Sequence, residues 1–114
     1  YVCDRQTNRI QVFQKNGSFV KEAVVAKETG GNGAAWDVAF SNDATQRTLY
    51  VADGQNQKIW VLQRDTLAVT GSFGRGGRLP GGFFGVGSIA VDSRGVVYTG
   101  ETFEGKRIQK FTAR

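Results

Sequence analysis

The sequence contains no histidine, no methionine, one cysteine and one proline. The lack of histidine removes the commonest general base and the commonest metal ligand of proteins. A single cysteine, Cys3, excludes an internal disulfide, and we expect a small, buried strand residue there rather than a reactive thiol. No apolar run approaches the roughly 20 residues of a membrane-spanning helix, so the sequence predicts no membrane span.

Several chemistry-bearing patterns are missing as well. The sequence has no G-x-x-x-x-G-K-[ST] phosphate loop, no zinc-ligand cluster and no nucleophile elbow, and it therefore predicts no catalytic residue. The net charge is +5, but the fifteen lysines and arginines are spread along the chain without a block of five or six. A basic balance of this kind favours anionic partners only where the charges gather on one face.

Glycine, by contrast, is abundant, with 16 residues. So many glycines indicate many tight turns, and hence many short strands. The share of hydrophobic residues is 39% and that of charged residues 22%, which is typical of a globular domain.

Three segments of the chain are versions of one pattern. They are YVCDRQTNRIQVF at Tyr1–Phe13, YVADGQNQKIWVL at Tyr50–Leu62 and YTGETFEGKRIQKF at Tyr98–Phe111, and they begin 49 and then 48 residues apart. A fixed period in this range predicts a repeat architecture, in which one supersecondary unit is copied and stacked. A residue that recurs in all copies then holds the repeat together, and one that breaks the pattern is a candidate for function.

Each copy predicts a β-hairpin, because two alternating β-type runs flank a polar turn. Ile10, Ile59 and Ile108 are expected to share one face with Val12, Val61 and Lys110, while Phe13, Leu62 and Phe111 lie on the other face. Two further strands recur, one over 17–25 and 67–73 and one over 36–40 and 87–91. Four antiparallel strands per unit of this length are typical of a β-propeller blade.

The strand count predicts an all-β chain with ten strands, or about two and a half blades. Residues 1–30 form a blade without its first strand, 31–80 a complete blade, and 81–114 a blade without its fourth strand. Propellers close into rings of four to eight blades. We therefore expect the remaining blades to come from the same longer chain or from further copies.

The residues resemble a known family at this point. RIQVF at Arg9–Phe13, YVAD at Tyr50–Asp53 and the run at Gly71–Tyr98 resemble the NHL repeat. The resemblance implies a β-propeller, most often six-bladed. The longer combination is similar to uncharacterised bacterial NHL proteins, often secreted, which implies an extracellular or periplasmic location. It also implies a C-terminal portion whose last blade borrows a strand from the N-terminus.

One enzyme subgroup is an alternative, since the first copy also resembles a blade of the peptidyl-hydroxyglycine amidating lyases. Those enzymes place metal-binding histidines at the start of innermost strands, where this sequence has Trp36 and Gly87. Neither residue binds zinc. A calcium or zinc ion would therefore need ligands from outside this segment. Arg5 and Arg9 match the stretch in which that family has an arginine, and the sequence does not choose between them.

The acids that follow the second strand recur in every copy; they are Asp4, Asp53 and Glu101. They could form a ring of carboxylates for a ligand or metal, but repetition favours acceptors that hold the turn. A basic residue opens each third strand, at Arg9, Lys58 and Arg107, and we expect it to pair with the acid across the hairpin.

Other candidates break the repeat. Trp36 and Asp37 stand where the next copy has Gly87 and Ser88; the tryptophan either stacks on a ligand or fills space between blades. The loop over 73–84 is rich in Arg, Gly and Phe, a combination that can bind RNA. The NHL resemblance instead implies a Gly-rich connection between blades with Phe73 and Phe83 buried, and we favour this connector. Asp92 is expected to cap a turn.

Fold analogy favours an interaction scaffold that presents loops to a protein or peptide. The alternatives are a metal-dependent lyase or hydrolase of the six-bladed type, and an RNA-binding propeller.

Overall fold

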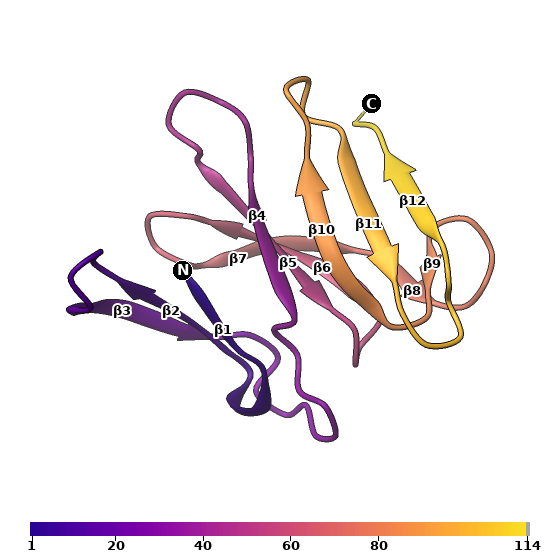
Figure 1. The fold of residues 1–114 in the computed structure, drawn as a ribbon, viewed down its shortest axis with the longest axis horizontal. Coiled ribbons are helices and arrows are strands. Elements are labelled where there is room, and N and C mark those ends of the chain that lie inside the picture. The colour runs from indigo at the N-terminus through magenta and orange to yellow at the C-terminus, as the bar shows by residue number, and fades with distance from the viewer. Residues whose placement is uncertain (114) are drawn as a thin grey trace.

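The computed structural model describes residues 1–113, and in that span the chain is all-β with almost no helix (Figure 1). The strands are β1 (Val2–Asp4), β2 (Arg9–Phe13), β3 (Phe19–Val24), β4 (Asp37–Phe40), β5 (Thr48–Asp53), β6 (Lys58–Gln63), β7 (Val69–Phe73), β8 (Arg75–Gly76), β9 (Gly82–Phe83), β10 (Val86–Val91), β11 (Val97–Glu101) and β12 (Ile108–Phe111). One 3-10 turn, η1 (Arg5–Thr7), links β1 to β2. The same residues include no helix long and apolar enough to cross a membrane.

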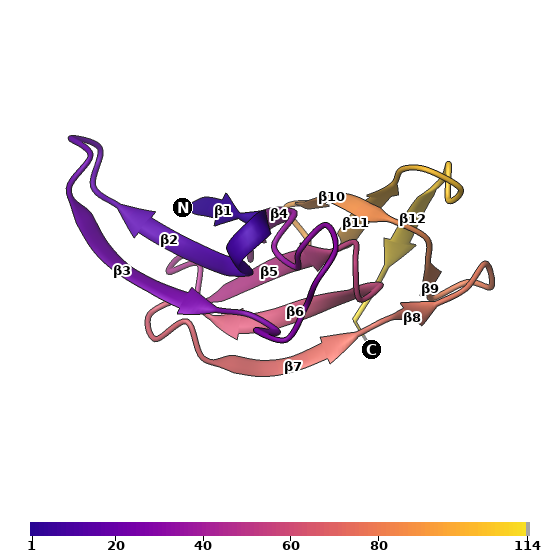
Figure 2. The same ribbon diagram turned by 90° about the horizontal axis from the view of Figure 1, so that it is seen from below.

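The strands form three antiparallel sheets in chain order. The sheets are β1-β2-β3, β4-β5-β6-β7 and β10-β11-β12, so the predicted four-stranded unit occurs once in full. Figures 1 and 2 show the four-stranded sheet between the two three-stranded sheets. All ten strands predicted from the sequence are present, and the all-β class is confirmed. The sequence missed the short parallel pair of β8 and β9, which lies inside the loop expected to be a plain connector.

The hairpins share one turn geometry. The last residue of each hairpin turn, one or two positions before the next strand, has a left-handed backbone, with φ of 58° at Asn8, 60° at Gln57 and 48° at Lys106. Such values are uncommon for residues other than glycine. Their recurrence every 49 residues shows that the repeat in the sequence is also a repeat in the backbone.

The hydrophobic core consists of two layers, one on each face of the middle sheet. Ile10 and Leu62 belong to the layer between the first and middle sheets. Ile59 and Phe83 belong to the layer between the middle and third sheets. Successive side chains of a strand point to opposite faces. The strand β6 therefore contributes to both layers, with Leu62 on one face and Ile59 on the other. Burial on both faces makes the middle sheet the centre of the molecule.

The three equivalent isoleucines differ in burial. Ile10 and Ile59 are fully buried, each facing the next sheet along the chain, whereas Ile108 is 79% exposed on β12. Lys110, which the sequence singled out as a break in the apolar pattern, is exposed on the same strand.

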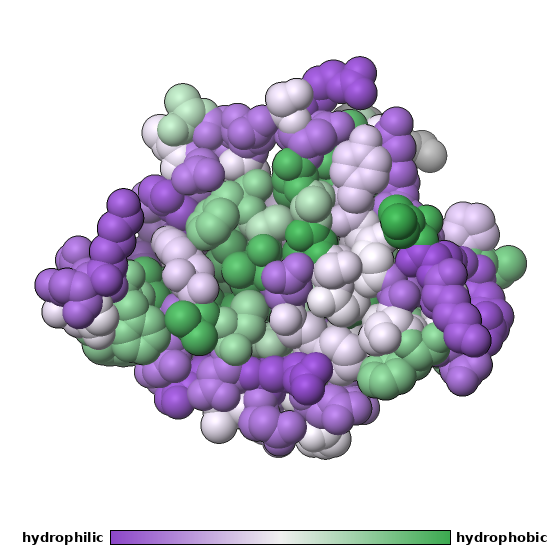
Figure 3. All heavy atoms as spheres, in the orientation of Figure 1, coloured by the Kyte–Doolittle hydropathy of each residue, from purple (hydrophilic) through white to green (hydrophobic). Residues whose placement is uncertain are grey.

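Figure 3 shows a further apolar area across the middle of the face on which β4 and β10 lie.

Candidate functional site

A cleft of about 690 Å³ opens beside the start of β4 and β10. One wall is formed by the third sheet, at the beginning of β10 and around the turn between β11 and β12. The other wall is formed by Arg5 of η1 and by Trp36, the residue before β4. The residues that line the cleft include Arg5, Trp36, Ser88, Phe103 and Lys106. The structure therefore brings together two residues that the sequence proposed separately, Arg5 and Trp36.

Trp36 forms a fixed wall of this cleft. Its indole Nε1 donates a hydrogen bond to the carbonyl of Gly33 at 2.7 Å. A Cβ atom on Gly54 would lie 2.7 Å from the indole ring, so the glycine leaves room for the tryptophan. The ring of Phe103 meets it edge to face, with centroids 6.2 Å apart. These contacts hold the indole in one orientation.

Arg5 lies over the indole face. Its guanidinium carbon is 4.7 Å from the ring centroid of Trp36, within the range of a cation–π contact. The backbone of Arg5 is held closely: its carbonyl accepts from the amide of Asn8 at 3.1 Å. A Cβ atom on Gly33, whose φ is +78°, would lie 1.7 Å from that carbonyl. Only glycine permits this approach, which presses the loop before β4 against η1.

Asn8 locks the same loop, a role that sequence reasoning missed. Its side chain is almost fully buried, donates to the carbonyl of Thr29 at 2.9 Å and accepts from the amide of Ala34 at 2.8 Å. Gln57 does the same one repeat later, accepting from the amide of Gly85 at 2.8 Å. The sequence did offer a signal for this role, since Asn8 and Gln57 are amide residues at equivalent positions of two repeats. Asparagine is one of the residues that tolerate a left-handed backbone.

Asp37 does not face the cleft. One carboxylate oxygen accepts from the amide of Val38 at 2.9 Å, and the other accepts from the amide of Ile89 at 3.0 Å. It therefore ties β4 to β10 across two sheets. Its charge also acts on Cys3, whose pKa is raised to about 11 by burial first and then by Asp37. The thiol is half-buried and protonated at neutral pH, as expected for a structural cysteine.

The acids of the first two hairpins bind partners within their own hairpins. Asp4 forms an ion pair with Arg9 at 2.8 Å, and the pKa of Asp4 is lowered by the Thr7 hydroxyl and then by Arg9. Asp53 is fully buried and accepts from the amide of Asn56 at 2.8 Å and from Nε1 of Trp60 at 2.8 Å. The predicted role as an acceptor that holds the turn is confirmed for Asp53. Asp4 does not cap the turn that follows it and is instead held by Arg9, and Glu101 accepts from the amide of Phe84, outside its own turn.

The predicted cross-hairpin pairing is confirmed in two units and wrong in the middle one. Arg9 pairs with Asp4, and Arg107 pairs with Glu101 at 2.6 Å. The ammonium of Lys58 instead lies 5.0 Å above the ring of Trp60. The reason is that donors from the turn and from Trp60 already occupy the Asp53 carboxylate. Among residues 1–113 the carboxylates do not gather, and no group of three or more Cys, Asp or Glu could hold a metal ion there.

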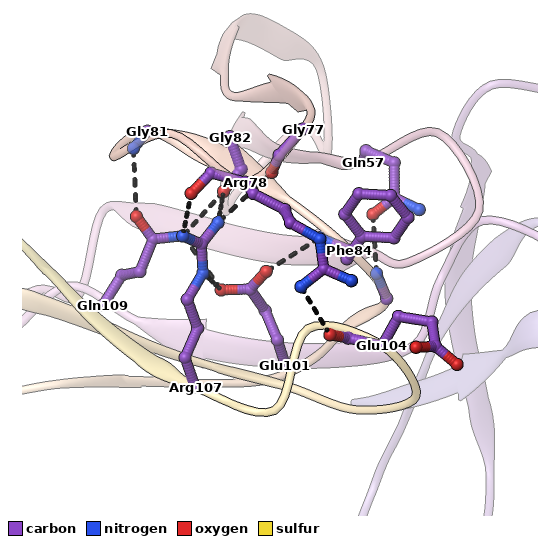
Figure 4. Close-up of polar contacts among 11 residues, drawn as sticks. Gln57, Gly77, Arg78, Gly81, Gly82, Phe84, Glu101, Glu104, Arg107 and Gln109 are labelled. Atoms are coloured by element: carbon purple, nitrogen blue, oxygen red, sulfur yellow. Dashed lines mark hydrogen bonds and ion pairs between the residues drawn. The ribbon is translucent and has the colours of Figure 1, made fainter.

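Glu101 is the centre of a buried network (Figure 4). Its carboxylate accepts from Arg107 at 2.6 Å, from Gln109 at 2.9 Å and from the amide of Phe84 at 2.7 Å. Burial raises the pKa of Glu101, but these donors outweigh it and leave the pKa below its ordinary value. Arg107 also donates to the carbonyl of Gly82 at 2.5 Å.

That network fastens the loop over 73–84 to the third sheet. Gln109 donates to the carbonyl of Gly82 at 2.7 Å and accepts from the amide of Gly81 at 3.0 Å. Phe83 is fully buried, and Phe73 is half-buried against Phe111. The predicted burial is confirmed in full for Phe83 and only in part for Phe73. Asp92 caps its turn as predicted, accepting from the amide of Arg94 at 2.8 Å.

Comparison with known proteins adds no family. A scan against protein-family models gives no match for this chain, and no curated protein matches it significantly. The NHL resemblance therefore stays a prediction from the motifs.

Proposed function

We propose that the chain is an arc of an NHL-type β-propeller that acts as a rigid binding scaffold for a protein or peptide. The observation that carries this proposal is the equivalence of Ile10 and Ile59. Each is fully buried, and each faces the next sheet along the chain. Repeated units that bury the same residue against the next unit form a stack in which each repeat contacts its neighbours.

The arrangement of the first strands of the second and third units is consistent with strands that surround a common axis. β4 and β10 lie side by side, and Asp37 joins them through the amide of Ile89. In a propeller the innermost strands surround a central channel. Under this proposal β4 and β10 line that channel, and Ile108 marks the place where a further sheet packs. Following the NHL resemblance, we also propose that the ring has six blades, supplied by a longer chain or by further copies. The same resemblance suggests an extracellular or periplasmic location.

The cleft at Trp36 is the surface that suits a ligand. It lies between the third sheet and the segments that carry Arg5 and Trp36, and a hydrogen bond and close packing fix the indole of Trp36. Pockets that are formed before binding avoid the cost of ordering side chains when the ligand arrives. A metal-dependent lyase or hydrolase remains the alternative, with metal ligands from outside residues 1–113.

The contacts of the loop over 73–84, which is rich in Arg, Gly and Phe, argue against RNA binding. The network of Glu101, Arg107 and Gln109 holds that loop against the third sheet, and Phe83 is buried. An RNA-binding loop presents its aromatics for stacking on bases.

Site-specific photo-crosslinking tests the scaffold proposal. A photoreactive phenylalanine analogue replaces Phe103 in the cleft or, as the control, Lys15 in the exposed turn between β2 and β3 of the intact protein. We expect a defined polypeptide to be captured from the cleft position and not from the control position. Equal capture at both positions, or none at either, would contradict the proposal. Capture of RNA that is lost as salt rises would favour the RNA-binding alternative.

A further inference from the structure

We infer that the cleft at Trp36 binds a carboxylate that lies beside an apolar or aromatic group on a peptide, with Arg5 as the anchor of the carboxylate. This inference rests on the proposed scaffold function and names the chemistry of its ligand.

The cleft is formed where the repeat is broken. Arg5 follows the hairpin acid in the first unit, and its equivalents are Gly54 in the middle unit and Thr102 in the third unit. Trp36 precedes an inner strand, and the equivalent residue of the third unit is Gly87. The repeat therefore does not need a large side chain at either position. The two large residues nevertheless converge, with Arg5 stacked on Trp36.

The charges in the cleft are unbalanced. Arg5 and Lys106 both line it, both are exposed, and neither forms an ion pair within residues 1–113. Glu101, the carboxylate among the lining residues, is fully buried at its side chain and already paired with Arg107. The cleft therefore presents two uncompensated positive charges. A carboxylate is the complementary group, because a guanidinium donates two parallel hydrogen bonds to it.

Stacking improves Arg5 as an anchor. A guanidinium that lies against an indole face keeps its edge free for hydrogen bonds, and it loses less side-chain entropy when a ligand binds. The indole is itself fixed by Gly33 and Gly54. The geometry thus orients the donors of Arg5 before a carboxylate arrives.

Phe103 supplies the apolar part of the site. Its ring is 63% exposed, although the turn that carries it is hydrogen-bonded from Thr102 to Gly85 at 2.9 Å and from Gly105 to Thr102 at 3.1 Å. Phe103 has no counterpart in the shorter turns of the other two hairpins. An exposed aromatic on an ordered turn, edge to face with Trp36, gives an apolar group of the ligand a surface to cover.

The size and charge of the cleft favour a peptide over a nucleic acid. Its volume of about 690 Å³ is within the range of roughly 300–1,000 Å³ in which small ligands and side chains are enclosed. Two cations match one or two carboxylates, whereas a nucleic-acid groove follows several phosphates with many cations.

Fluorescence anisotropy with labelled peptides tests the inference on the intact protein. Three probes are used: an end-blocked peptide with glutamate between leucine and phenylalanine, the same peptide with glutamine, and a glutamate-free peptide with a free C-terminal carboxylate after phenylalanine. We expect at least one carboxylate peptide to bind about tenfold more tightly than the glutamine peptide, as expected for a charge-assisted contact. The comparison of the two carboxylate peptides identifies the source of the carboxylate.

Variants locate the contact. Arg5→Gln is expected to weaken binding of the carboxylate peptide about tenfold, while the control Arg94→Gln, which removes the same charge from an exposed turn, changes it less than about twofold. Trp36→Phe keeps an aromatic wall and is expected to weaken binding less than Arg5→Gln. Thermal unfolding of each variant verifies that the fold is retained.

The inference is overturned if the glutamine peptide binds equally well, if Arg5→Gln and Arg94→Gln have the same effect, or if RNA binds where peptides do not. Failure of this kind leaves the scaffold proposal standing when a polypeptide is still captured by the photoreactive analogue at Phe103. Loss of that capture contradicts the scaffold proposal itself.

Discussion

At the scale of single residues, Glu101 shows how one buried carboxylate joins distant segments. It accepts hydrogen bonds from Arg107 and Gln109 on one side and from the amide of Phe84 on the other. Each donor favours the ionised form, and together they overcome the cost of burial, so the pKa of Glu101 is lowered. The same pKa shift links the stability of the fold to pH.

The first prediction concerns acid unfolding. Because the pKa of Glu101 is lower in the folded chain than its ordinary value of 4.5, its stabilising contribution is fully present above pH 4.5 and is lost as pH falls through the folded-state pKa. Glu101→Gln should therefore flatten the fall in the free energy of unfolding below about pH 4.5, measured by urea titration at several pH values.

The lowered pKa values of Asp4 and Asp92 act in the same direction, so part of the pH dependence will remain in that variant. Glu28→Gln is the matched control, because Glu28 is exposed and outside the network. An acid limb that is unchanged by Glu101→Gln, or changed equally by the control, would show that the network does not stabilise the fold.

The second prediction concerns the glycine against Trp36. In Gly54→Ala the new Cβ atom would lie 2.7 Å from the indole ring, so we expect a loss of about 1–3 kcal/mol in the free energy of unfolding. Gly71→Ala is the control, because no heavy atom lies within 4 Å of its Cβ position. Denaturant unfolding measures both. Equal effects of the two substitutions would argue against a fixed indole.

At the scale of strands and sheets, equivalent positions have unequal surroundings. Ile10 and Ile59 are fully buried between sheets, and Ile108 is 79% exposed. The sequence alone predicts the same role for all three. The burial differs because a further sheet packs on β2 and on β6, whereas β12 has no such sheet among the described residues. This difference is the basis of the third prediction.

Ile59→Ala should cost roughly 2–5 kcal/mol in the free energy of unfolding, because it leaves a cavity between sheets. In the 114-residue chain alone, Ile108→Ala should cost less than about 0.5 kcal/mol, as for other exposed substitutions. If further sheets close a ring, as proposed, the cost of Ile108→Ala in the closed ring should rise toward that of Ile59→Ala. If the two variants differ in the native particle as much as in the chain alone, no further sheet covers β12.

Strand positions were predictable because alternation, turn residues and the repeat agreed with one another. The faces of β2 and β6 followed from the alternation, since Ile10 and Ile59 were assigned correctly before any neighbour was known. The β8–β9 pair was not predictable, because two-residue strands carry too few side chains to form a pattern. The left-handed residue before each third strand was also missed, although asparagine at Asn8 offered a hint.

The candidate site was predicted only in part. Arg5 and Trp36 were named, but their contact depends on Gly33 and Gly54, whose importance lies in close approach rather than in any motif. Asp37 was proposed as a ligand-binding residue, and the structure instead places both of its oxygens on backbone amides. Long-range contacts of this kind, 52 residues apart for Asp37 and Ile89, leave no local signal in the sequence.

At the scale of the whole molecule, three sheets stack with the four-stranded sheet in the middle (Figure 2). The stack has an exposed isoleucine on β12 and exposed apolar residues on the first sheet, including Phe19 and Val24. Exposed strand edges and apolar faces promote association unless they are covered. A closed ring would cover both ends of the stack at once.

The mass of the native particle, measured by native mass spectrometry of the protein from its source, tests the ring most directly. The proposal predicts a particle of about two to three times the 12.4 kDa of this chain, either as one longer polypeptide or as several copies, because a six-bladed ring needs that many sheets. A folded, monodisperse particle of 12.4 kDa would contradict it.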